Sequence, residues 1–257
     1  SEFCATRLLV IVEEGGSLSL LDDYGGGGLF GKPSLISSVV EIFVGRNARI
    51  TYAVVQHLPT STTFSLVQRT HAQAGAKSLT VVSTLGSCLA RIDAGTVLLG
   101  EGAQSKSLGL VLAGDGQHLD HRTLHDHRAS HTHSNSNYRT VLQGRSRCIY
   151  TGSIRIDALA KHCEAYQENR NLMLSDDARA DSIPELEIMN NDVRCSHGSA
   201  TGPPDPEQVH YMRSRGIPPQ EAARLLVEGF TEPVTSSLPD SAREKVNGAA
   251  AFREEKN

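Results

Sequence analysis

The chain has 257 residues and a formal net charge of −4. This length suits one large domain, or one large and one small domain, and is enough to bury a core. The slight acidic excess, without a stripe of lysine and arginine, argues against nucleic acid as a partner. There is no run of about 18 apolar residues, so we expect no membrane span, and no signal peptide is visible.

The cysteines are odd in number and widely spaced, and none forms a CxxC pair; they are Cys4, Cys88, Cys148, Cys163 and Cys195. This pattern argues against a disulfide framework and against a zinc site built from cysteine pairs. We therefore expect reduced thiols and a cytoplasmic protein. The chain starts at Ser1 without methionine, so we expect the natural protein to extend upstream. A transit peptide in that segment would make the location plastid.

Short alternating runs separated by small turn residues fill the first 202 residues. Gly15, Gly45 and Gly75 stand 30 residues apart, each between two such runs, and we expect all three to occupy the same turn position with positive φ. The pattern recurs less regularly at 89–99, 153–156 and 183–188. A fixed repeat favours a solenoid, in which each coil stacks on the one before it. A jelly roll, a propeller or a β-sandwich with accidental spacing is the alternative.

The pattern becomes helical from residue 203. Asp205 is placed to cap a first helix, and Gly216 is placed to end it. A second amphipathic helix is predicted from Pro219, with its end at Pro233. Residues 236–257 contain one more candidate helix and a polar tail that we expect to be frayed.

These boundaries predict an all-β core over residues 1–202 and a small α-helical domain over residues 203–257. No nucleophile elbow, P-loop or dinucleotide-binding motif occurs in the sequence. The run of glycines at 25–28 lacks a following helix start with lysine and serine, so we expect a flexible turn there. The absence of these motifs argues against an enzyme.

A group of histidines occurs in one strand-like region: His118, His121, His125, His127, His131 and His133. His125 with His127, and His131 with His133, form two HxH pairs of the kind that present metal ligands on a strand. A cupin-like metal-dependent enzyme is therefore the alternative function. Charged residues such as Asp126 lie between the histidines, and this favours a solvated strand face without a metal.

Cys195 and His197 form a second candidate site, because alternate residues of a strand point to the same side. A thiolate and an imidazole suit a soft or borderline metal such as iron, and they could also form a nucleophile pair. Two ligands are too few for a stable metal site, so another chain would have to complete it. The plainer interpretation is a buried thiol beside a surface histidine.

Five segments of the C-terminal half occur in an order and spacing typical of one family: YQENRNLMLSDD (166–177), PELEI (184–188), DVRCSHG (192–198), YMRSRGI (211–217) and EAARLLVEGF (221–230). Together they resemble the SufB/SufD family of iron–sulfur cluster assembly proteins. A weaker likeness continues upstream through 116–121 to 7–10, so the resemblance covers almost the whole chain. It implies a right-handed parallel β-helix followed by a small helical domain.

The resemblance also implies a non-catalytic scaffold of the SUF system that pairs with a SufB-like subunit and docks a SufC-like ABC-type ATPase. Cys195 and His197 would lie at the subunit interface, where iron or an iron–sulfur cluster is held transiently and no cofactor is bound tightly. When isolated, the chain could form a homodimer. The implied ATPase-docking residues are Tyr211, Arg213, Arg215, Gly216, Ile217, Glu221, Leu225 and Phe230.

Two departures from the SufB pattern favour the SufD type. SufB-like chains carry a cysteine shortly before the Pro-x-(Leu/Ile)-Glu segment, whereas residues 177–181 contain none. They also tend to carry acidic residues beside the histidine, where this chain has Ser196 and Gly198. We therefore expect no sulfur-accepting role of the SufB kind.

Overall fold

The computed structural model describes residues 2–25 and 32–254, with the backbone alone at residues 247 and 249–254. The predicted turn at 25–28 lies, except for Gly25, outside the described residues, as does the end of the polar tail. The strands are β1 (Glu2–Val12), β2 (Ser17–Tyr24), β3 (Ser34–Val44), β4 (Arg49–Gln56), β5 (Thr62–Ala72), β6 (Lys77–Thr84), β7 (Leu89–Leu98), β8 (Gln104–Ala113), β9 (His118–His127), β10 (His133–Leu142), β11 (Arg147–Ile156), β12 (Cys163–Met173), β13 (Arg179–Ile188) and β14 (Val193–Gly202).

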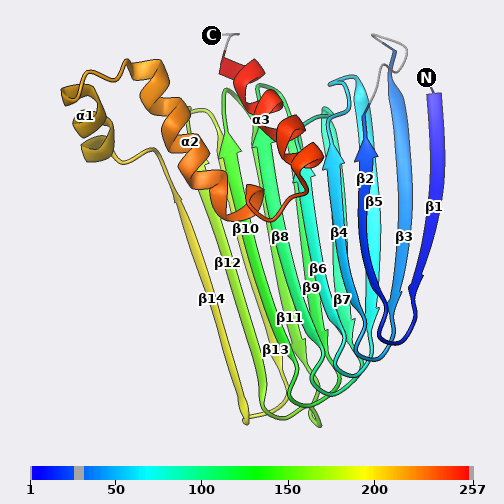
Figure 1. The fold of residues 1–257 in the computed structure, drawn as a ribbon. Coiled ribbons are helices and arrows are strands. Elements are labelled where there is room, and N and C mark those ends of the chain that lie inside the picture. Colours follow the sequence, from blue (N-terminus) through cyan, green and yellow to red (C-terminus); the bar gives the residue numbers. More distant parts are fainter. Residues whose placement is uncertain (1, 26–31, 255–257) are drawn as a thin grey trace.

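The strands form a parallel β-solenoid, as predicted. Odd-numbered strands make one seven-stranded sheet, sheet A, and even-numbered strands make a second, sheet B. Each coil contributes one strand to each sheet, and every pairing is parallel. The turns that lead from an odd strand into the next even strand form one edge of the solenoid, at the bottom of Figure 1 and here called the lower edge. Regular stacking buries the inward side chains of each coil against its neighbours.

The lower edge carries a ladder of residues with positive φ, one in each of the first six coils. They are Gly15 (68°), Asn47 (54°), Gly75 (66°), Gly102 (73°), His131 (58°) and His162 (55°). The backbone N–H of each donates to a carbonyl of the next coil, as from Gly15 to Arg46 and from Asn47 to Ala74, both at 2.9 Å. Glycine and asparagine tolerate this conformation well.

Gly45 does not hold the position that the 30-residue spacing predicted. Register pairs Ser17 with Arg49 and Arg49 with Lys77, so successive steps are 32 and 28 residues, and Asn47 takes the turn position instead. Gly45 is needed for another reason. A Cβ there would lie 2.8 Å from the backbone nitrogen of Glu14. The prediction of a solenoid was correct, but this glycine permits a close approach of two backbone segments in adjacent coils.

The interior changes from apolar to polar along the solenoid. Phe64 and Leu66 in β5 are fully buried. Further along, polar and aromatic polar side chains occupy inward positions and are at most 1% exposed: His121, His125, His127, Tyr138 and Tyr150. Buried polar groups of this kind usually need hydrogen-bond partners inside the protein.

Three helices follow the strands: α1 (Pro206–Ser214), α2 (Pro219–Thr235) and α3 (Asp240–Glu254). The carboxylate of Asp205 accepts a hydrogen bond from the Glu207 N–H at 2.9 Å, so the predicted cap is confirmed. Gly216 follows α1 with φ of 82°. The predicted end of α2 at Pro233 is wrong, because α2 continues to Thr235. A proline in the last turn removes a single helical hydrogen bond, which the packing of Val234 can offset.

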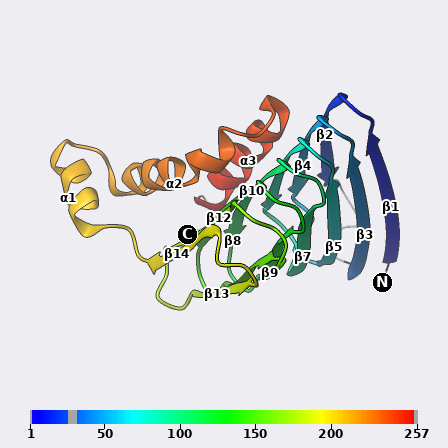
Figure 2. The same cartoon turned by 90° about the horizontal axis from the view of Figure 1, so that it is seen from below.

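Helices α2 and α3 lie across the outer face of sheet B, whereas α1 projects away from the solenoid (Figures 1 and 2). Val227, Val234 and Leu238 join one apolar cluster with Val55 and Leu110 of sheet B. None of the residues of α1 is buried. The region after Gly202 is therefore attached through α2 and α3, and α1 is left exposed.

Candidate interaction site

The last coil, formed by β13 and β14, is uncovered because no further coil of the described chain stacks on it. The inward side chains of β13 include Leu186 and Ile188, which are 40% and 39% exposed. Their neighbours one coil earlier, Ile154 and Ile156, are at most 1% exposed. The terminal coil thus presents a face built like the core, together with two free strand edges.

Cys195 and His197 lie on this inward side of β14. Register places Cys195 beside Ala165 and His197 beside Gln167, both buried inward residues of β12. The structure brings the two predicted residues onto one face, with Cys195 partly buried and His197 exposed. This agrees with the plainer interpretation of the pair, and it also leaves both side chains facing the uncovered end.

The thiol of Cys195 rests against the last buried layer of the solenoid, where it packs on a small cluster that includes Cys163. Burial first, and then the neighbouring Cys163 thiol, raise the pKa of Cys195, although a backbone hydrogen bond at Ala165 opposes this. A raised pKa keeps the thiol protonated at neutral pH. A metal ion or an added positive charge would be needed to favour the thiolate.

The histidine group is divided between the interior and the surface. His121, His125 and His127 are inward residues of β9 and are buried, so the expectation of a solvated face is wrong for them. The intervening Asp120 and Asp126 alternate with them on the opposite side of β9, but their side chains are only 14% and 5% exposed, so they do not form a solvated face either. His131 lies in the lower-edge turn and His133 is the first residue of β10; their side chains are 55% and 41% exposed. The alternation of charge and histidine therefore marks the two sides of one strand.

The buried histidines are held by hydroxyl groups. His127 Nδ1 lies 2.8 Å from Thr132 Oγ1 and its Nε2 lies 2.8 Å from Ser134 Oγ. His125 Nε2 lies 3.1 Å from Ser107 Oγ. Burial lowers the pKa of His125 to about 4 and that of His127 to about 3. These imidazoles are neutral hydrogen-bonding groups of the core at physiological pH.

Across the described residues, no group of three or more His, Cys, Asp or Glu side chains is arranged to hold a metal ion. His125 and His127 face the interior, whereas His131 and His133 face solvent at the lower edge. The four histidines considered as metal ligands therefore do not converge. This removes the geometric support for a cupin-like metal centre.

An apolar pocket of about 390 Å³ lies between α1 and α2 at the upper ends of β12 and β14. Leu225 and Phe230, both predicted for docking, line it. Sequence reasoning missed further lining residues, namely Leu172, Gln208, Met212, Leu226 and Gly229. The helical spacing of Leu225, Leu226, Gly229 and Phe230 was the available signal.

The other docking candidates lie around this pocket without lining it. Tyr211 is 59% exposed, and the guanidinium of Arg215 lies 5.2 Å from its ring centroid. Glu221 forms an ion pair with Arg224 within α2. Arg213 and Gly216 are also exposed, and Ile217 is partly buried. Together with the pocket, these residues form the α1–α2 surface, a mixed apolar and basic area.

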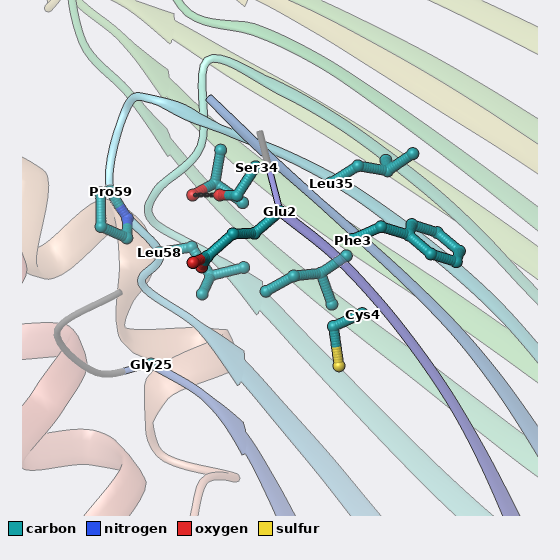
Figure 3. Close-up of a pocket in the computed structure, with 10 residues that line it drawn as sticks. Glu2, Phe3, Cys4, Gly25, Ser34, Leu35, Leu58 and Pro59 are labelled. Atoms are coloured by element: carbon teal, nitrogen blue, oxygen red, sulfur yellow. Dashed lines mark hydrogen bonds between the residues drawn. The ribbon is translucent and has the colours of Figure 1, made fainter. Parts of the chain in front are cut away.

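A second pocket, of about 560 Å³, lies at the opposite end of the solenoid (Figure 3). Phe3, Leu35, Leu58 and Pro59 give it an apolar lining, and Cys4 contributes one thiol. The described lining contains no histidine or second cysteine, so it offers no nucleophile and base pair.

No described helix is long and apolar enough to cross a membrane.

The sequence of the chain matches proteins of one family over most of its length. Residues 1–230 match the family model described as "SUF system FeS cluster assembly, SufBD core domain". An iron–sulfur cluster assembly SufBD family protein of Mycobacterium tuberculosis is 36% identical over 254 residues, covering 95% of this chain and 62% of the relative. A SufBD family protein of Staphylococcus epidermidis is 30% identical over 249 residues, covering 97% of this chain and 53% of the relative.

The chain thus spans between half and two thirds of the length of these curated relatives. The family match covers every strand of the solenoid, α1 and most of α2. The chain belongs to the SufBD core domain family of the SUF system of iron–sulfur cluster assembly.

Proposed function

We propose that this chain is a non-catalytic scaffold subunit of the SufD type, which pairs with a SufB-like subunit and docks a SufC-like ABC-type ATPase. The observation that carries the proposal is the uncovered terminal coil, which presents Cys195 and His197 beside apolar core-like side chains. Family membership supplies the process, iron–sulfur cluster assembly.

The terminal coil has the properties of a subunit interface. Leu186 and Ile188 expose apolar surface that would be buried if another strand layer were stacked on them. The free edges of β13 and β14 offer unpaired backbone groups to a partner strand. A partner that covers this end would enclose Cys195 and His197 between the two proteins. The same surface could pair two copies of this chain when the partner is absent.

The two side chains are too few to hold iron alone, so we assign them a transient role. A SufB-like partner would supply the remaining ligands, and the cluster would sit between the subunits. Closure by the partner would also remove water from the site. No tightly bound cofactor is part of this proposal.

The α1–α2 surface is proposed as the ATPase-docking region. Its apolar pocket gives buried area, and the exposed Arg213 and Arg215 give charge around it. Interfaces commonly combine an apolar centre with a polar rim in this way. Assignment to the SufD type rests on the cysteine-free segment 177–181 at the start of β13 and on Ser196 and Gly198 beside His197.

Co-expression with a SufB-like and a SufC-like protein, followed by affinity purification of this chain, tests the proposal. We expect both proteins to co-purify, and Arg215→Glu to weaken only the ATPase interaction. Arg46→Glu at the exposed lower edge is the matched charge reversal and should change neither. If this chain is folded but one or both of the two proteins do not co-purify with it, the proposal is contradicted. One tightly bound metal ion per purified chain, lost on His125→Ala/His127→Ala, would favour a metalloenzyme instead.

A further inference from the structure

Two exposed histidine rings lie against each other, with tilted planes, at the lower edge of the solenoid. The ring centroids of His131 and His162 are 4.8 Å apart, and the ring planes are inclined by 33°. Their side chains are 55% and 54% exposed. The two residues are 31 positions apart in sequence and meet because they occupy equivalent places in successive coils.

The backbone at both positions is unusual for residues with a side chain. His131 and His162 have φ of 58° and 55°, where the first four coils have three glycines and Asn47. Side chains raise the energy of this conformation, although asparagine and histidine tolerate it better than most. Strained positions often occur at functional sites, so the two histidines are candidates for a functional role.

Each of the two imidazole rings has a carboxylate beside it. His162 Nδ1 lies 3.2 Å from Asp192 Oδ1, and His131 Nε2 lies 3.9 Å from Glu101 Oε1. When His162 donates its Nδ1 proton to Asp192, the lone pair remains on Nε2. Metal-binding histidines in proteins are usually oriented by such a carboxylate on the other ring nitrogen. Asp192 and His162 also line an open pocket of about 340 Å³, which leaves room for water.

We propose that His131 and His162 form a two-imidazole site for a borderline divalent metal ion such as Zn²⁺, Ni²⁺ or Cu²⁺. Imidazole nitrogen suits these ions. With metal–nitrogen bonds of about 2.1 Å, two nitrogens can be bridged at up to about 4.2 Å. The ring centroids are 4.8 Å apart and both side chains are exposed, so side-chain rotation would have to turn one nitrogen of each ring toward a shared ion. With two protein ligands the site would bind the ion weakly and reversibly, and water would complete the coordination.

The two histidines belong to the fifth and sixth coils, and only Asp192 comes from the turn of the terminal coil. The site lies away from Cys195 and His197 and does not depend on the proposed function. Calorimetric titration of the full chain with nickel chloride tests it, at slightly alkaline pH where free imidazoles are neutral. The titration is done in a Cys195→Ser/His197→Ala background, so that the thiol and imidazole of the terminal coil cannot bind the added metal. We expect one Ni²⁺ per chain. His131→Asn and His162→Asn should each lower the affinity at least about tenfold, and Asp192→Asn should lower it about tenfold.

Asparagine is a suitable replacement because Asn47 holds the same backbone conformation in the second coil. The asparagine variants should therefore melt at the temperature of the parent, which separates lost binding from lost folding. His133→Asn is the matched control: the His133 side chain is 41% exposed near the same edge, and its Nδ1 lies 3.6 Å from the Glu164 carboxylate. It should bind Ni²⁺ like the parent. Absence of saturable binding, or an equal loss in His133→Asn, would overturn the proposal.

Discussion

The guanidinium of Arg139 in β10 lies 5.4 Å from the centroid of the Phe230 ring in α2. Arg139 is 8% exposed, and its Nη2 and Nε atoms each lie 3.0 Å from an acceptor, on Glu168 and Asn137 respectively. Burial lowers the pKa of this arginine, which the charge of Glu168 opposes. A charged group held between sheet B and α2 thus connects the α1–α2 surface to the solenoid.

Removing Glu168 should leave the Arg139 charge without its carboxylate. We expect Glu168→Ala to lower the free energy of unfolding by about 2 kcal/mol, because an unpaired charge in a buried place is costly. Combining it with Arg139→Met should restore much of the loss. Chemical denaturation measures both. Glu185→Ala, which removes an exposed partner of Ser153, should cost no more than about 0.5 kcal/mol.

The buried histidines predict a pH dependence of stability. Burial lowers the folded-state pKa of His121 to about 3, against about 6.5 when unfolded. Such a group favours the folded state fully above the unfolded pKa and progressively less as the pH falls toward the folded pKa. Unfolding free energy should therefore fall between about pH 6.5 and 3, by about 1.4 kcal/mol per pH unit for a histidine such as His121.

His121 isolates this effect, because neither of its ring nitrogens has a hydrogen-bond partner in the described structure. His121→Leu should raise the unfolding free energy at neutral pH by about 1 kcal/mol and reduce the acid slope by one proton. Denaturation curves at several pH values measure this. An unchanged slope would mean that the histidine is not neutral and buried in solution.

Gly45 and Gly198 form a matched pair for the packing between coils. A Cβ at Gly45 would lie within 3.0 Å of three backbone atoms, whereas nothing lies within 4 Å of one at Gly198. Gly45→Ala should lower the unfolding free energy by about 2 kcal/mol, and Gly198→Ala should change it little. Equal effects in thermal or chemical denaturation would contradict the close approach at Gly45.

His197 is predicted to act in cluster assembly without supporting the fold. It is exposed on β14, so His197→Ala should keep the melting temperature within about 1 °C while lowering cluster formation by the reconstituted complex. The iron–sulfur absorption band and its rate of appearance give the readout. His210→Ala on the exposed α1 is the control. A collapse of thermal stability would show that His197 is structural.

The regular features of the fold were predictable because they depend on local sequence. Gly15 and Gly75 mark turns, and Asp205 and Gly216 begin and end α1. The number of residues in each coil is not set by local sequence, because it depends on the length and conformation of the turns between the strands. Gly45 was therefore placed wrongly, and the meeting of His131 with His162 could not be foreseen.

The interior histidines show a second limit. His121 and His125 alternate with charged residues, and this pattern is the same for a polar surface and for a strand with a polar inner side. Ser107, which lies near His125, comes from a different strand. Hydroxyl partners that make a buried imidazole acceptable are thus visible only after the coils are stacked.

The affinity of a SufB-like subunit for this chain tests the central claim most directly. Leu186 at the terminal coil and Phe43 on the outer face of sheet A are 40% and 41% exposed, so they make a matched pair. If the terminal coil is the interface, Leu186→Asp should weaken binding at least about a hundredfold, as expected for a charge in an apolar contact. Phe43→Asp should bind like the parent. Unchanged binding by Leu186→Asp, or equal loss in both variants, would contradict the account.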